Sequence, residues 1–181
     1  MKRAQKKIGN ADNMPSFRYN RCIFYVVLLF ITVFIPAKVD SQIVVVVPSK
    51  SKIDSLSFKD LQKIFDGQKV DAIGENPCQI VEFAQSSDAF YKKLYNLDAY
   101  AVGKHWLRLI FSGERVLPPK NFTRIDKFLK YFIEQENSIG FLSAEAFEKV
   151  KNNSLRAVVI EGLNYQHTHY VLRKNIKQKN R

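Results

Sequence analysis

Cysteine is scarce in this chain, which has only two in 181 residues. Cys22 lies inside an apolar run, residues 22–37, and Cys78 lies in the middle of the chain. If the N-terminal segment is removed, Cys78 is left alone, so an internal disulfide is excluded. No pair of small residues precedes Cys22, which argues against a lipid-anchored protein. We expect Cys78 to be a part-buried, small apolar side chain.

The motifs of common enzyme classes are also absent. The sequence has no G-x-S-x-G nucleophile elbow, no phosphate-binding P-loop and no dinucleotide fingerprint. His167 and His169 stand two residues apart, without a cysteine or a third ligand at metal spacing. We therefore expect no catalytic residues, no metal and no cofactor.

Acidic residues are few beside basic ones, 17 against 29, which gives a formal net charge of +12. The excess lies at the two ends. Residues 1–41 contain seven Lys and Arg against two acids, and residues 162–181 contain five against none. The middle of the chain, residues 42–161, has a net charge of only +2. Such a distribution does not form the basic surface that follows nucleic-acid phosphates, so we expect no nucleic-acid partner.

One apolar run is long enough to be considered as a membrane or export segment. Residues 22–37 carry no charge and follow Arg18 and Arg21. The run is shorter than the ~20 residues that a membrane-spanning helix needs. A basic start, an apolar centre and small residues after it are typical of a secretory signal peptide. We expect residues 1–41 to be a signal peptide cut near residues 37–42, with Met14 as an alternative start, and the mature protein to be periplasmic. An uncleaved N-terminal anchor is the alternative.

The rest of the chain alternates between strand-like and helix-like segments. Strands are expected at residues 42–47, 79–84, 138–142 and 155–161, the first of them apolar on both faces and therefore central. Helices are expected at residues 57–66, 86–95, 98–111, 125–132 and 143–150, with Ser57 and Thr123 as side-chain caps of the first and the fourth. This alternation predicts an α/β fold with a mostly parallel sheet flanked by helices. The domain is expected over residues 42–161, followed by a basic tail, residues 162–181, that is disordered or loosely docked.

Three short motifs occur in a fixed order. They are LQKIFDG at residues 61–67, W-x-x-x-x-F-S-G followed by two prolines at residues 106–119, and SIGFL at residues 138–142. Each alone is compatible with a helix end or a buried strand. Together they resemble the substrate-binding proteins of phosphate ABC transporters. The resemblance covers residues 42–161 and implies a periplasmic-binding-protein-like lobe of the type 2 fold, in a short stand-alone member. We expect Trp106 to serve the core rather than a ligand.

The segment EFAQSSDAF, residues 82–90, is where the resemblance implies an anion site. Members of the family have an arginine here, then Ser-Gly-Thr, then a helix with a phenylalanine. Ser86, Ser87 and Phe90 match that pattern, Asp88 replaces the threonine, and the arginine and glycine are missing. Hydroxyls and backbone N–H groups at a helix N-terminus hold oxyanions, helped by the helix dipole. The same serines are good helix caps, so the two roles stay open at this point. Asp88 is expected in the first turn of the helix, where it would compete with an anion for the same N–H groups.

A second candidate is the loop of residues 48–54, which follows the first expected strand. Open parallel sheets bind ligands at the carboxyl ends of their strands. We expect an anion, if one binds, to lie between this loop and the serines of the helix start. The candidate anion-binding residues are Ser49, Lys50, Ser51, Ser86, Ser87 and Asp88, with Arg108 and Ser138 as further candidates.

The resemblance implies an exported solute-binding protein that holds phosphate or a similar small oxyanion. Its further partner would be an ABC transporter permease or another envelope protein. The alternative is a non-transport interaction module of the cell envelope that uses the same fold without a tight ligand. The missing arginine and the short mature chain favour the alternative, whereas the motifs and the serine helix start favour an anion-binding protein.

The first prediction concerns export. We expect a protein expressed in a Gram-negative host to reach the periplasm with its N-terminus between Lys38 and Ile43, because the apolar run follows two arginines and precedes small residues. N-terminal sequencing of periplasmic protein measures this. Recovery of the chain in the membrane fraction with residues 22–37 intact would contradict it.

Overall fold

The computed structural model describes residues 42–74, 78–152 and 154–173. The expected signal segment, with Met14 and Cys22, lies outside the described residues, as do residues 174–181. No described helix is both long and apolar enough to cross a membrane.

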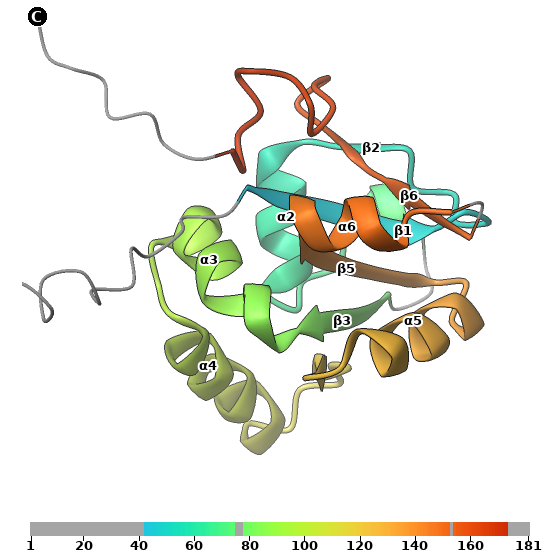
Figure 1. Cartoon of the computed structure of the whole chain (residues 1–181). Helices are drawn as coiled ribbons and strands as arrows, with labels where there is room; N and C mark the ends of the chain where they lie inside the picture. The colour runs from blue at the N-terminus through green and yellow to red at the C-terminus, as the bar shows by residue number, and fades with distance from the viewer. Residues whose placement is uncertain (1–41, 75–77, 153, 174–181) are drawn as a thin grey trace, which may run out of the picture. The chain divides into compact units, whose positions relative to one another are not determined.

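A five-stranded mixed sheet forms the centre of the described part (Figure 1). Its strand order is β4 (Lys120–Phe122), β3 (Gln79–Phe83), β5 (Ser138–Ser143), β1 (Ile43–Pro48) and β6 (Leu155–Ala157). β3 pairs in parallel with β4 and β5, while β1 is antiparallel to both β5 and β6. Four of these five strands therefore run in one direction, and β1 runs against them. The predicted α/β fold with a mostly parallel sheet is confirmed.

β1 is the central strand that its sequence predicts. All six of its residues are buried. Ile43, Val45 and Val47 pack on one side of the sheet, whereas Val44 and Val46 pack on the other. Because alternate residues of a strand point to opposite faces, an uninterrupted apolar run requires helices on both faces.

Helices cover both faces of the sheet. α2 (Phe58–Phe65), α3 (Ala84–Tyr95) and α4 (Ala99–Phe111) contribute to the core on the face of Ile43 and Val45. α5 (Ile125–Glu134) and α6 (Ala144–Val150) contribute to the core on the opposite face. A single 3-10 turn, η1 (Asp71–Ile73), follows α2. The result is a three-layer arrangement of helices, sheet and helices.

Aromatic side chains from three elements fill the first core. The rings of Phe90 and Phe141 stack with centroids 4.0 Å apart, and Phe65 packs edge-on against Phe90 at 4.7 Å. Phe65 is the phenylalanine of the LQKIFDG motif, and Phe141 belongs to SIGFL. The two motifs therefore meet in the core, where such ring pairs add to the stabilisation from burial alone.

Three helices begin at the capping residue expected from the sequence, and two do not. Ser57, Asp98 and Ser143 are N-caps whose side chains accept a backbone N–H, as helix-capping residues do. The expected caps of the other two helices are wrong. α3 begins at Ala84, directly after β3, so Ser86 and Ser87 lie inside its first turn. α5 has Arg124 at its N-cap position with no side-chain cap, in place of the expected Thr123.

The C-terminal end of the chain also differs from expectation. The expected last strand is divided into β6 and β7 (Val159–Ile160), and β7 pairs in parallel with β2 (Ser55–Leu56) in a separate sheet. Residues 162–173 are not a loose tail, because Tyr170 and Leu172 are buried in the core. The backbone N–H of Ile43 donates to the carbonyl of Leu172 over 3.2 Å. The domain therefore extends to Arg173 at least.

The second prediction concerns Gly140 in β5. A Cβ at this position would lie 2.6 Å from the carbonyl oxygen of Val81 and within 3.3 Å of the Phe128 and Phe132 rings. We expect Gly140→Ala to lower the free energy of unfolding by roughly 1–3 kcal/mol or more, because the β3–β5 pair must move apart. Gly103→Ala is the control, since its Cβ would meet nothing within 4 Å inside α4. In urea unfolding, Gly103→Ala should be as stable as the wild type and Gly140→Ala less stable. Equal stabilities of the two variants would contradict the close approach of β5 to β3 at Gly140.

Candidate functional site

The carboxyl ends of three strands meet at one edge of the sheet. β3, β4 and β5 are parallel, and each leads within a few residues into a helix, namely α3, α5 and α6. Helix N-termini carry partial positive charge and unpaired backbone N–H groups. This edge is therefore the electropositive side of the sheet's backbone, and the α3 start with Ser86 and Ser87 belongs to it.

The start of α3 is held by hydrogen bonds inside the protein. The Ser86 hydroxyl oxygen accepts the backbone N–H of Ser143, the N-cap of α6, over 3.0 Å. The Ser87 hydroxyl donates to the carbonyl of Phe83 over 3.3 Å. Both serines are buried. The Ser86 hydroxyl accepts a hydrogen bond from Ser143, so its own hydrogen can still be donated to another acceptor. The Ser87 hydroxyl already donates its hydrogen to Phe83.

Asp88 does not lie in the first turn of α3, contrary to the expectation from sequence. Because the helix begins at Ala84, Asp88 comes one turn later, and its carboxylate accepts the N–H of Ala99 at the start of α4 over 2.9 Å. It joins two helices and does not compete for the first N–H groups of α3. α3 has no side-chain N-cap at all. Its first-turn N–H groups are thus without a capping side chain.

The loop of residues 48–54 lies at the opposite edge of the sheet. β1 is antiparallel to β5, so its carboxyl end lies beside the amino end of β5. Lys50 accordingly forms an exposed ion pair with Glu136, just before β5, over 3.2 Å. The backbone N–H of Ser49 donates to the carbonyl of Ser154, and the Ser51 hydroxyl accepts the N–H of Ile53. The predicted convergence of this loop with Ser86 and Ser87 is wrong, since the length of a six-residue strand, about 20 Å, separates them.

The remaining two candidates lie elsewhere. Ser138 is fully buried at the start of β5, and its hydroxyl donates to the carbonyl of Gln135 over 2.8 Å. Arg108 lines a hollow of about 270 Å³ between the end of α2 and α4. There His105 contacts the Asp66 carboxylate over 3.0 Å. Neither residue is part of the edge where α3 begins.

Sequence reasoning missed a buried carboxyl at this edge. Glu82, the fourth residue of β3, is 8% exposed. Its carboxyl accepts hydrogen bonds from the Tyr91 hydroxyl of α3 and from the Asn121 amide of β4, the second over 3.0 Å. Burial raises the pKa of the Glu82 carboxyl, although the two hydrogen bonds oppose that shift. A single acid inside the apolar strand QIVEF was the signal that could have identified it.

Metal binding finds no support within the described ranges, where no group of three His, Cys, Asp or Glu side chains could hold an ion. His167 and His169 have ring centroids 5.7 Å apart. The His169 N–H donates to His167 Nδ1, so the pair is part of the local turn structure.

The sequence matches no protein-family model. Nor does it match any curated protein.

Solved structures do resemble this fold. A protein from Clostridium perfringens, named as a phosphate ABC transporter substrate-binding protein with bound phosphate, is 16% identical with a TM-score of 0.50, over 69% of this chain and 47% of that one. An ABC-type phosphate transport receptor from Vibrio cholerae is 16% identical with a TM-score of 0.44, over 68% of this chain and 48% of that one. A protein from Planctomyces limnophilus, named as phosphate-binding, is 14% identical with a TM-score of 0.49, over 66% of this chain and 41% of that one.

The likeness to the Clostridium perfringens protein shows the fold, which is that of a lobe of such binding proteins. All three are named for phosphate binding or transport, not for an enzyme activity. This chain spans about half the length of the structures that it resembles.

The third prediction follows from the buried Glu82. The folded state holds the Glu82 proton more tightly than the unfolded chain, so the free energy of unfolding should fall as pH rises above the ordinary value of 4.5 and level off above the raised pKa. Glu82→Gln removes this titration. Chemical unfolding of both proteins from about pH 4 to about pH 8 measures the difference. We expect the wild type to lose stability relative to Glu82→Gln as pH rises, and a difference that is constant across this range would contradict the raised pKa.

Proposed function

We propose that this chain is an exported solute-binding protein that holds a small oxyanion, with phosphate as the first candidate, over the first turn of α3. The observation that carries the proposal is that α3, at the edge where three parallel strands end, has no side-chain N-cap. An anion there would accept hydrogen bonds from the first-turn N–H groups, which no side chain caps.

Ser86 supplies the side-chain donor in this proposal. Its oxygen is fixed by the N–H of Ser143, which orients the hydroxyl, and its hydrogen remains for an anion. The Glu82 carboxyl is close in sequence, two residues before Ala84. Burial raises the pKa of the Glu82 carboxyl, although its hydrogen bonds from Tyr91 and Asn121 oppose that shift.

The remaining parts of the proposal come from the sequence and the fold together. Export is supported by the charge-free run of residues 22–37 behind two arginines. An ABC transporter permease as partner is supported by the names of the structures with the same lobe.

A second candidate function is a non-transport interaction module of the cell envelope. The observation that favours it is the internal use of the predicted ligand residues, since Ser87 and Asp88 both have partners within the fold. α4 also exposes large apolar side chains, with Tyr100 71% and Phe111 85% exposed. Exposed apolar surface of this kind is common where proteins contact partners.

The fourth prediction compares the two neighbouring serines. Ser86→Ala removes the free hydroxyl hydrogen and should weaken phosphate binding by roughly 1.5–3 kcal/mol, about ten- to a hundredfold in Kd. Ser87→Ala is the matched control and should leave Kd almost unchanged, because its hydrogen is already donated to Phe83. Isothermal titration with phosphate measures both, with the melting temperature recorded to confirm that each variant is folded.

Two results would contradict the anion site. If both variants bind phosphate as tightly as the wild type, Ser86 does not contact the anion. If titration of the wild type with phosphate, sulfate and small organic anions gives no binding heat, the interaction module is favoured.

A further inference from the structure

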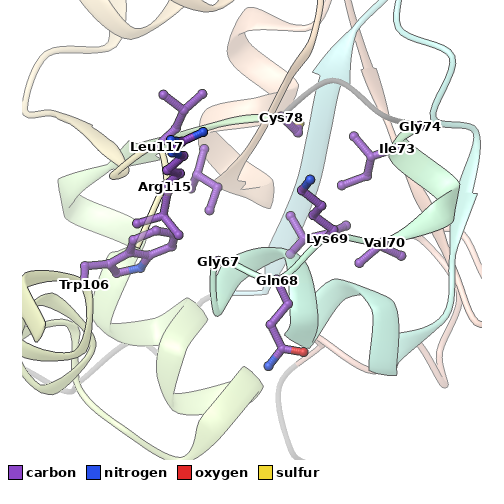
Figure 2. A pocket seen from close by; sticks show the side chains of 13 residues that line it. Gly67, Gln68, Lys69, Val70, Ile73, Gly74, Cys78, Trp106, Arg115 and Leu117 are labelled. Carbon is purple, nitrogen blue, oxygen red and sulfur yellow. The ribbon is translucent and has the colours of Figure 1, made fainter. Parts of the chain in front are cut away.

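A separate cavity of about 80 Å³ lies at the amino end of β3, on the side of the sheet covered by α2 and α4 (Figure 2). Its walls come from the end of α2, the segment of residues 67–74, the first residues of β3, Trp106 of α4 and residues 115–117. One water needs roughly 10–15 Å³ of such space, so several non-hydrogen atoms fit. The start of α3 lies at the other end of β3.

The walls are mainly apolar. Figure 2 shows Trp106, Arg115 and Leu117 on one side and Lys69, Val70 and Ile73 on the other. Cys78 also contributes, and burial raises the pKa of its thiol to about 12, so the sulfur stays neutral at physiological pH. An apolar wall of this kind favours a ligand with an apolar body.

The charged side chains that line the cavity have one sign among the residues that the structure describes. Lys69 and Arg115 line it, and no acidic side chain does so among the described residues. Both cations are exposed, and neither has an ion-pair partner within the part of the chain that the structure describes. Two cations on facing walls attract an anionic group to the mouth of the cavity.

A buried donor without a partner lies in the same wall. Trp106 is 5% exposed, and its indole Nε1–H has no hydrogen-bond partner among the described residues. Buried donors in proteins are nearly always paired, so an acceptor is expected here. The ring itself is fixed by packing, because Gly67, at φ +84°, leaves room for the indole edge at 3.0 Å from where a Cβ would lie.

We propose that this cavity binds a small organic carboxylate with a short apolar body, a ligand separate from the oxyanion at α3. The carboxylate lies between Lys69 and Arg115, one of its oxygens accepts from a donor such as the indole N–H, and the hydrocarbon contacts the apolar wall. A dianion such as phosphate suits the cavity poorly, since most of its oxygens would face apolar side chains. A neutral molecule would leave the two cations without a counter-charge.

Trp106 is the only tryptophan in the chain, so its fluorescence reports on the cavity directly. The purified protein is titrated with isobutyrate and with isobutyramide, its neutral amide, at constant ionic strength. We expect isobutyrate to change Trp106 emission saturably with a Kd of about millimolar, as a ligand of this size allows. Isobutyramide should bind at least about tenfold more weakly.

Two double variants with the same change of charge complete the test. Lys69→Gln with Arg115→Gln should weaken isobutyrate binding about tenfold or more, whereas Lys127→Gln with Lys130→Gln on α5 should not change it. Ser86→Ala should also leave it unchanged, which separates this site from the phosphate proposal. The carboxylate site is wrong if isobutyrate gives neither a saturable emission change nor a higher melting temperature. It is equally wrong if acid and amide bind alike, or if the two double variants weaken binding equally.

Discussion

The direction of β1 in the middle of the sheet determines which residues can act together. Its backbone pairs with β5 and β6 in antiparallel register, from Ile43 opposite Ser143 to Pro48 opposite Leu155. Its carboxyl end therefore lies at the edge where β5 begins, and its amino end lies near the start of α6. The loop after β1 and the helix after β3 are consequently on opposite edges. A ligand at one cannot reach the other, so the anion that we propose at the α3 start would bind without the lysines of the loop.

The motifs that resemble phosphate-transporter proteins hold the lobe together. Gly140 of SIGFL lets β5 approach β3, and Gly67 of LQKIFDG lets the indole of Trp106 pack against the end of α2. Phe65 and Phe141 join the same motifs inside the core. These residues preserve the shape of the lobe whether or not a ligand binds. The two proposed binding sites use other residues, namely Ser86 and Glu82 at one edge and Lys69 and Arg115 at the other.

Much of the fold could be predicted from the sequence, because its signals are local. The β-branched run of β1, the capping residues Ser57, Asp98 and Ser143, and the alternation of strands and helices are read from neighbouring residues. The direction of β1 could not be predicted in this way, since an apolar run does not indicate how it pairs. The same limit applies to Ser86, whose partner Ser143 is distant in sequence, and to Leu172, whose burial depends on contacts with β1. Glu82 was visible in the sequence, but its partners Tyr91 and Asn121 follow only from the fold.

The central claim is that an oxyanion binds over the first turn of α3, and amide NMR tests it residue by residue. Phosphate is added to isotope-labelled protein, and the shifts of the backbone N–H signals are followed. We expect the largest saturable shifts at Ala84–Ser87, with Ser143 also affected through its hydrogen bond to Ser86. Shifts confined to Ser49–Lys52, or no saturable shift at any amide, would contradict it.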